Sequence, residues 1–170
     1  MNHCLGYLQD DARNPGWKRC PSCGFCLEKP KMSKEIITLD AFYMGRKEKF
    51  QTEWSVDIEE NAVILLRRVN SLLNDLGITE AKVYSGWRPA AINAQTPNAA
   101  KKSAHMIGKA VDIIDDQNQT LGHLITNNPS LLKKYDLWIE ALDSTRGKFT
   151  NWVHLDFVNR SDRDSRSFHP

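Results

Sequence analysis

Three residues in two short segments have the types and the spacing of a metal site. His105 and Asp112 lie seven positions apart in KKSAHMIGKAVDII, and His154 lies in NWVHLDF. Two imidazoles and a carboxylate are ligand types that zinc takes in catalytic sites, where a fourth position stays open for water. Taken singly, Asp112 could equally be a salt-bridged surface residue, and each histidine could be a hydrogen-bonded one. Together the three are candidate ligands of one zinc ion.

The strands expected around two of these residues place them on one face of a sheet. Asp112 interrupts an apolar run, and side chains alternate between the two faces of a strand. Val111 and Ile113 would meet the core, while Asp112 points to the opposite face, where an ionised carboxylate needs water, a cation or hydrogen-bond donors. In NWVHLDF the same alternation directs His154 and Asp156 away from the core. An aspartate and a histidine would thus share an open face.

The remaining pattern predicts an α+β domain, with a small antiparallel sheet and helices packed on one side. Apolar residues recur at helical spacing from Asp57, the expected N-cap, to Leu76, and Gly77 ends the run. The segments AKVYSG, KAVDII, LWIEAL and NWVHLDF indicate strands. The polar connection between the last two favours an antiparallel hairpin. Helical turns are expected between Gln119 and Lys134.

Composition and charge narrow the class of protein. The chain has 170 residues, of which 41% are hydrophobic and 26% are charged, as in an ordinary globular protein. A formal net charge of +2 is too small to indicate a nucleic-acid partner. No apolar run approaches the roughly 20 residues of a membrane span. The N-terminal segment carries acids where a signal peptide would be apolar, so we expect a protein that is cytoplasmic as made.

The cysteines divide the chain. All four fall in the first 26 residues: Cys4, Cys20, Cys23 and Cys26. We therefore expect an N-terminal extension over residues 1–31 and the main domain over 32–170. The segment CPSCGFC has the Cys-x-x-Cys-Gly turn of a zinc knuckle, which makes the four cysteines candidate ligands of a second, structural zinc. His3 is an alternative to Cys4 as the fourth ligand. Reduced, unliganded cysteines in a tail are an equal alternative.

Three blocks of sequence resemble a known family. SGWRP (Ser85–Pro89), SAHMIGKAVDI (Ser103–Ile113) and WVHLD (Trp152–Asp156) are similar to the signature blocks of the M15-type zinc peptidases. These include D-alanyl-D-alanine carboxypeptidases, related dipeptidases and phage L-alanyl-D-glutamate endolysins, which share a fold with hedgehog signalling domains. The middle block, Ser-x-His-x-x-Gly-x-Ala-x-Asp, matches at every fixed position. The resemblance covers about residues 33–170 and does not include the cysteine segment.

The resemblance implies a hedgehog/DD-peptidase-like domain with zinc bound by His105, Asp112 and His154. It also implies that Arg88 faces the active site, where a guanidinium would suit a substrate carboxylate or the developing oxyanion. An arginine that only pins the turn after a strand is the alternative for Arg88.

Two further residues in these blocks are candidates for substrate binding. Ser103 opens the middle block and could instead only cap the loop. Trp152 precedes the last block's histidine by two positions. It could line a cleft, or it could only pack against other aromatic side chains.

The general base is where this sequence departs from the family pattern. Many relatives place an acid three residues before the last histidine ligand, where it takes a proton from water and passes it to the leaving amine. Here that position is Asn151, which cannot act as a base. We expect Glu140, on the strand LWIEAL, to approach His154 across the hairpin instead. Asp143 is the second candidate, and both could instead be solvated loop acids.

The function implied is a zinc-dependent peptidase that cleaves peptidoglycan stem peptides, as a D,D-carboxypeptidase or as an endopeptidase of the L-Ala-D-Glu type. Small size and the absence of a signal peptide favour a monomeric phage or prophage lysis enzyme, released to the cell wall by a holin-type partner. A cytoplasmic carboxypeptidase acting on recycled peptides is a second version. Because of Asn151, a non-catalytic zinc module that binds cell wall or a protein partner is the alternative. The modest charge does not favour a nucleic-acid-binding protein organised around the cysteines.

Overall fold

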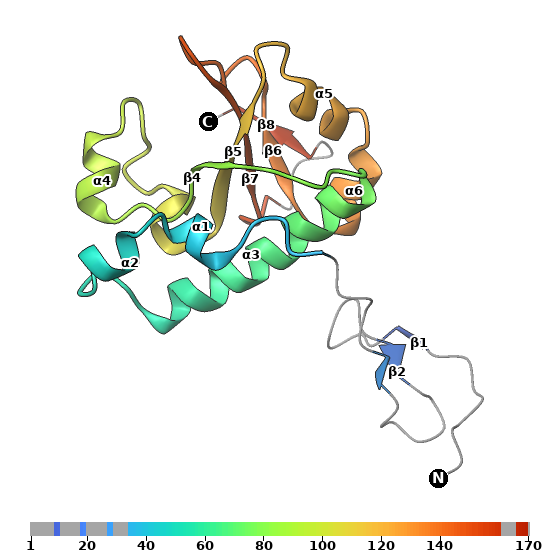
Figure 1. Ribbon diagram of the computed structural model, residues 1–170, viewed down its shortest axis with the longest axis horizontal. Helices are drawn as coiled ribbons and strands as arrows, with labels where there is room; N and C mark the ends of the chain where they lie inside the picture. Colours follow the sequence, from blue (N-terminus) through green and yellow to red (C-terminus); the bar gives the residue numbers. More distant parts are fainter. Residues whose placement is uncertain (1–8, 11–17, 20–26, 29–33, 161–165, 170) are drawn as a thin grey trace. The chain divides into compact units, whose positions relative to one another are not determined.

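The computed structural model describes residues 9–10, 18–19, 27–28, 34–160 and 166–169 (Figure 1). The chain divides into two compact units, residues 1–33 and 34–170. The described residues of the first unit form a three-stranded antiparallel sheet of β1 (Gln9–Asp10), β2 (Lys18–Arg19) and β3 (Leu27–Glu28). The candidate ligands of a second zinc, His3, Cys4, Cys20, Cys23 and Cys26, lie outside the described residues.

The second unit is an α+β domain built on a five-stranded sheet of order β4-β5-β7-β6-β8. Its strands are β4 (Val83–Ser85), β5 (Ala110–Asp115), β6 (Trp138–Glu140), β7 (Asn151–Asp156) and β8 (Ser167–Phe168). Its helices are α1 (Leu39–Tyr43), α2 (Arg46–Lys49), α3 (Val56–Asp75), α4 (Ala90–Gln95), the 3₁₀ helix η1 (Ala104–Ile107), α5 (Thr120–Thr126) and α6 (Pro129–Lys134). No helix in the described part of the chain is long and apolar enough to cross a membrane.

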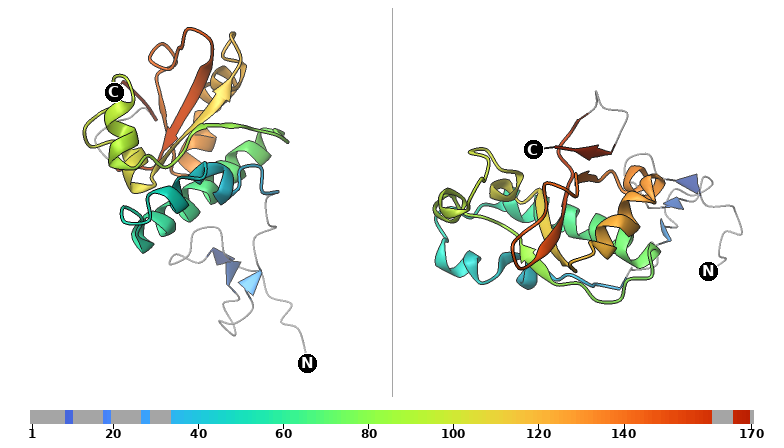
Figure 2. Two further views of the ribbon diagram at one scale, coloured as in Figure 1. Left: turned by 60° about the vertical axis from the view of Figure 1, so that its left-hand side comes forward. Right: turned by 90° about the horizontal axis from the view of Figure 1, so that it is seen from above.

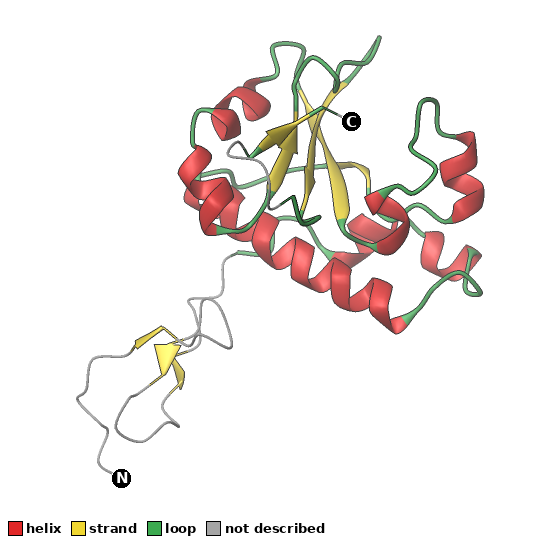
Figure 3. Cartoon of the chain, turned by 180° about the vertical axis from the view of Figure 1, so that it is seen from behind, coloured by secondary structure: helices red, strands yellow, loops and turns green. Residues whose placement is uncertain are grey.

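Helix α3 is the main support of the sheet. Figures 1 and 2 show it crossing one side of the strands, and Figure 3 shows the short helices around the edges of the sheet. Most of the apolar stripe that the sequence predicted is buried: Ala62, Leu65, Leu66, Val69, Leu72 and Leu73. Leu76 is only partly buried, and Ile58 joins the buried face. The start of the helix differs from the prediction, because Ser55 rather than Asp57 is the N-cap. The Ser55 hydroxyl accepts a hydrogen bond from the Ile58 amide, and Asp57 instead lies in the first turn, near the positive end of the helix dipole.

The central strands have the predicted alternation of faces. β5 and β7 pair antiparallel over six positions, and Asp112 lies directly opposite His154. The neighbours of Asp112 and His154 along the two strands are fully buried in the core: Val111, Ile113, Val153 and Leu155. The core therefore occupies one face of this strand pair, and the polar side chains of Asp112 and His154 occupy the other.

The prediction of a small antiparallel sheet was wrong in one respect: the sheet is mixed. β6 and β7 form the expected antiparallel pair, but β8 pairs parallel with β6 on the far edge. The Ile139 amide donates to the Arg166 carbonyl, and the Ala141 amide donates to the Phe168 carbonyl. The tail is polar, so its sequence did not indicate a strand. Its backbone nevertheless supplies partners to an otherwise open sheet edge, and Phe168 is buried there.

Candidate metal centre

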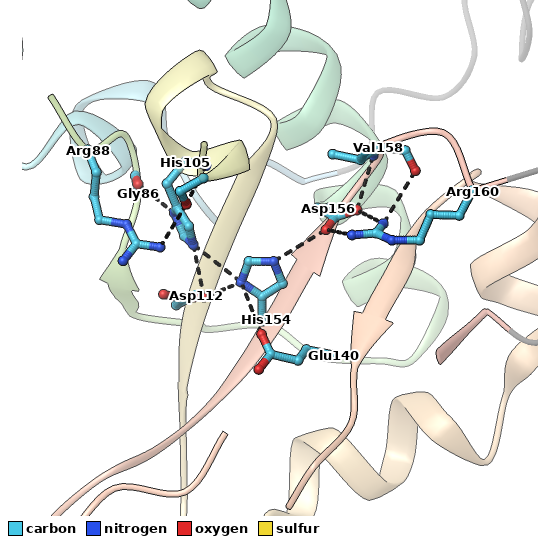
Figure 4. Close-up of polar contacts among 10 residues, drawn as sticks. Gly86, Arg88, His105, Asp112, Glu140, His154, Asp156, Val158 and Arg160 are labelled. Atoms are coloured by element: carbon cyan, nitrogen blue, oxygen red, sulfur yellow. Dashed lines mark hydrogen bonds and ion pairs between the residues drawn. The ribbon is translucent and has the colours of Figure 1, made fainter. Parts of the chain in front are cut away.

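His105, Asp112 and His154 converge on the face of the sheet away from α3. Asp112 Oδ1 lies 2.7 Å from His154 Nδ1 and 3.3 Å from His105 Nε2. The two histidine nitrogens lie 3.3 Å from each other, and all three side chains are buried. Figure 4 shows the three side chains meeting at one point, from η1, β5 and β7. The group could hold a metal ion.

The 3₁₀ helix η1 brings His105 to the two strands. The Ser103 hydroxyl caps it by accepting a hydrogen bond from the His105 amide. Gly108 ends it in the left-handed region, with φ of 74°. A Cβ atom on Gly108 would lie 2.6 Å from the Ile58 carbonyl oxygen. Glycine is therefore required here both by the backbone conformation and by the close approach of η1 to α3.

The hydrogen bond on the far side of the His105 ring sets its tautomer. His105 Nδ1 lies 2.8 Å from the Gly86 carbonyl oxygen, which can only accept. Nδ1 therefore carries the proton, and the lone pair of Nε2 is free to face Asp112. Burial lowers the pKa of His105, so the ring is neutral and suited to bind a metal ion.

His154 presents Nδ1 to the cluster and Nε2 to the opposite side, where Asp156 Oδ2 lies 3.4 Å away. Burial alone would lower the pKa of His154, but hydrogen bonds to Asp112 and Asp156 raise it to about 10. Although burial opposes it, the hydrogen bond and the positive charge of His154 hold the pKa of Asp112 well below its usual range. Without a metal ion, Asp112 is thus a carboxylate beside an imidazolium.

Glu140 lies at the edge of the cluster. Ile139 on β6 pairs with Leu155 on β7, and the next step of this register places Glu140 beside His154. Its Oε2 lies 4.0 Å from His154 Nδ1, and only 14% of its side chain is exposed. Burial raises the pKa of Glu140, and the nearby Asp112 adds to this effect. The structure thus brings Glu140 to the position across the hairpin that the sequence suggested.

The two other positions considered for a base lie elsewhere. Asn151 is buried at the start of β7, where its Nδ2 donates to the backbone carbonyls of Asp116 and Gln117. Its amide therefore holds the turn after β5. The Asp143 side chain is 73% exposed and lies 3.8 Å from His169 Nδ1, so solvent surrounds it.

Arg88 points toward the cluster from the segment after β4 (Figure 4). Its Nη2 donates to the Ser103 hydroxyl at 3.3 Å. Among the described residues, no acceptor lies within hydrogen-bond distance of its buried Nε. Burial lowers the pKa of Arg88, while the negative charges of Asp112 and Glu140 oppose this effect. A half-buried guanidinium that points toward the cluster can bind an anion or a polarised oxygen.

Trp152 lies on β7, two residues before His154 and on the same face. Its ring stacks on that of Tyr84, with centroids 5.4 Å apart. Ile114 is the cross-strand partner of Trp152, and Tyr84 and Ile114 are both exposed. These three residues form an apolar patch next to the cluster of His105, Asp112 and His154. Alternation along β5 placed Ile114 on this face, whereas nothing in the sequence indicated that Tyr84 would join it.

The ion pair that contacts Nε2 of His154 was also not identified from the sequence. Asp156 was expected on the open face, but its partner was not identified. Arg160 makes two hydrogen bonds to it, Nη1 to Oδ1 at 2.5 Å and Nη2 to Oδ2 at 2.8 Å. An acid followed four positions later by an arginine was the available signal. That spacing suggests contact within a helix, and here the chain forms a loop after a strand.

These residues come from segments far apart in the chain, and the fold brings them to one place. Comparisons with protein-family models, with curated proteins and with solved structures each found no match. The assignment of a function therefore rests on the geometry of the cluster and on the three sequence blocks that contribute to it.

Proposed function

We propose that this protein is a zinc-dependent peptidase that cleaves peptidoglycan stem peptides, with the hedgehog/DD-peptidase-like fold of the M15-type enzymes. One observation carries the proposal. A His-Asp-His ligand set, with its ligand atoms 2.7 to 3.3 Å apart, has a largely buried carboxylate 4.0 Å from one of its members. A ligand set alone would serve a structural ion, and the adjacent Glu140 is what favours hydrolysis.

The donor atoms fit zinc. Bonds of about 2.0–2.1 Å at tetrahedral angles separate zinc ligands by about 3.3–3.4 Å. His105 Nε2 lies 3.3 Å from both of the other ligand atoms. The third pair, Asp112 Oδ1 and His154 Nδ1, is closer, at a hydrogen-bond distance of 2.7 Å. Two imidazole nitrogens favour zinc over calcium or magnesium, which prefer oxygen ligands.

Glu140 is proposed as the general base. A bound zinc ion would polarise the scissile carbonyl and make water more acidic. Glu140 would accept a proton from water as the water oxygen bonds to the carbonyl carbon. It would then give that proton to the amine nitrogen as the carbon–nitrogen bond breaks. Its raised pKa supports this role, because a base that must later act as an acid works best with a pKa near the working pH.

Arg88 is proposed to bind the substrate. Its guanidinium, which points toward the cluster (Figure 4), suits either the carbonyl oxygen that becomes negative or a carboxylate of the stem peptide. Ser103 accepts from Arg88 and so orients the guanidinium. The patch of Tyr84, Ile114 and Trp152 would contact the small apolar side chains of a stem peptide.

The resemblance of the sequence blocks to both groups of enzymes supports two versions of the reaction, a D,D-carboxypeptidase and an endopeptidase of the L-Ala-D-Glu type. We also propose that the protein acts in phage or prophage lysis, reaching the cell wall through a holin-type partner. The block SGWRPAAIN, which is similar to phage-associated members of the family, supports this setting.

The test is the hydrolysis of purified stem peptides by the zinc-loaded protein and by two variants. Glu140→Gln removes the base but keeps the size of the side chain, and Asp143→Asn is a matched control three residues further along, in the connection after β6. The proposal expects Glu140→Gln to retain zinc and to lose at least about 100-fold in rate, while Asp143→Asn keeps the wild-type rate. Zinc binding without cleavage by the wild type would favour the alternative, a zinc module that binds cell wall or a protein partner.

A further inference from the structure

Behind His154, on the side away from Asp112 and His105, the buried Asp156 forms an ion pair with the half-buried Arg160. Asp156 is 1% exposed, and its Oδ2 lies 3.4 Å from His154 Nε2. Both of its oxygens accept from the Arg160 guanidinium, and Oδ1 also accepts from the Val158 amide at 3.0 Å. Figure 4 shows the row of side chains from His154 through Asp156 to Arg160.

Aromatic rings from β6 and β8 pack on the Arg160 guanidinium. Its central carbon lies 3.7 Å from the centre of the Phe168 ring and 5.5 Å from that of Trp138. Phe168, on β8, also meets the His154 ring edge-on, with centroids 6.0 Å apart. The last strand of the chain therefore contacts both ends of this row of side chains.

A histidine can bind a metal ion through one nitrogen only if the proton sits on the other. Nδ1 of His154 faces Asp112 and His105, so the proton must be on Nε2, where it needs an acceptor. Asp156 is the acceptor available. A buried carboxylate without a counter-charge is costly, and Arg160 supplies that charge through two parallel hydrogen bonds.

We propose that Asp156 and Arg160 are positioning residues that keep the proton of His154 on Nε2 and direct Nδ1 at the metal ion. The inference rests on the proposed zinc site and adds two residues to it that touch neither metal nor substrate. It also makes the C-terminal strand a part of the metal site, because Phe168 packs on both Arg160 and His154. Carboxylate groups that orient ligating histidines typically change metal affinity 10- to 100-fold when they are mutated.

Four variants separate this role from a general effect on folding. Asp156→Asn keeps the shape but removes the charge, and Arg160→Met removes the guanidinium. Arg160→Lys keeps a positive charge but loses the planar pair of donors. Arg166→Met is the matched control, because Arg166 also pairs with an aspartate, Asp136, at 2.8 Å and also lies over Trp138. In the described part of the chain, Arg166 makes no contact with His154.

The measurement is the dissociation constant for zinc, obtained by competition with a chromophoric chelator, alongside the thermal unfolding of each metal-free protein. We expect zinc to bind about 10- to 100-fold more weakly to Asp156→Asn and about 10-fold more weakly to Arg160→Met. Arg160→Lys should lie between Arg160→Met and the wild type, and Arg166→Met should bind zinc like the wild type. In the zinc-loaded wild type, a proton on His154 Nε2 should be visible by NMR.

The outcomes distinguish this inference from the proposed function. Zinc binding by Asp156→Asn and Arg160→Met that equals the wild type would overturn the positioning role and leave the zinc site standing. A loss of affinity that only follows a lower unfolding temperature of the metal-free variants would overturn it as well. If the wild type itself bound no zinc, the proposed function would fail and this inference with it.

Discussion

Asp112 and His154 face each other across the β5–β7 pair, with Asp112 Oδ1 2.7 Å from His154 Nδ1. In the metal-free protein this contact joins a carboxylate to an imidazolium. A metal ion would take the place of the proton between these two atoms. Both the stability of the metal-free fold and its affinity for metal should therefore depend on pH.

The metal-free protein should lose stability as the pH rises from 6.5 to 9. The pKa of His154 is raised to about 10 from an ordinary 6.5. The stabilisation that protonated His154 adds to the folded state is complete below pH 6.5 and is lost as the pH rises toward 10. We expect the free energy of unfolding to fall by roughly 2–3 kcal/mol between pH 6.5 and 9, measured by urea titration with a chelator present. His154→Gln should remove most of this dependence of the free energy of unfolding on pH. An unchanged dependence would contradict the assignment of the effect to His154.

Zinc binding should release close to one proton at pH 7.5. Nδ1 of His154 is protonated in the metal-free cluster, and it must lose that proton to become a ligand. Calorimetric titration of zinc in buffers with different ionisation enthalpies measures the number of protons released. Zinc affinity should also rise about tenfold for each pH unit in this range. Binding without proton release would show that His154 is not a ligand.

Substitution of Arg88 should impair hydrolysis and leave zinc binding intact. We expect Arg88→Met to lower kcat/KM on stem peptides by about 100-fold or more, with a zinc affinity near that of the wild type. A rise in KM alone would assign Arg88 to a substrate carboxylate, and a fall in kcat would assign it to the developing oxyanion. Arg68→Met, which removes an ion pair with Asp136 outside the site, is the control. Normal kinetics for Arg88→Met would exclude both roles.

Gly108 should be necessary for the position of His105. Gly108 and Gly77 both have positive φ, 74° and 72°, so alanine at either position should cost about 1–2 kcal/mol of stability. Only at Gly108 would the added Cβ meet a backbone atom, the Ile58 carbonyl oxygen at 2.6 Å. We therefore expect Gly108→Ala to destabilise the protein more than Gly77→Ala and to weaken zinc binding. Equal effects on stability and zinc affinity would mean that the close approach has no role.

Local patterns in the sequence were sufficient to predict the parts of the fold that carry the candidate ligands. Alternation along β5 and β7 placed Asp112 and His154 on one face because each strand has an apolar side that must meet the core. The hairpin of β6 and β7 followed from two apolar segments joined by a polar connection, and it brought Glu140 to His154. These are contacts between neighbouring strands, and the sequence pattern specifies them directly.

Contacts that depend on long-range packing could not be predicted in the same way. β8 has two residues in a polar tail, and what makes it a strand is the free edge of β6, which no local pattern reveals. The place of Arg160 depends on Phe168 and Trp138, which come from two different strands. The N-cap of α3 was misplaced by two residues because Ser55 and Asp57 are both good caps, and only packing decides between them.

The most direct test of the central claim is digestion of purified peptidoglycan by the zinc-loaded protein, followed by mass spectrometry of the released fragments. His154→Ala removes a proposed ligand and serves as the comparison. The proposed function predicts new stem-peptide fragments that appear with the wild type and disappear with His154→Ala, and their masses would identify the bond that is cut. No fragments from the zinc-loaded wild type, or the same fragments from His154→Ala, would contradict a zinc peptidase at this site.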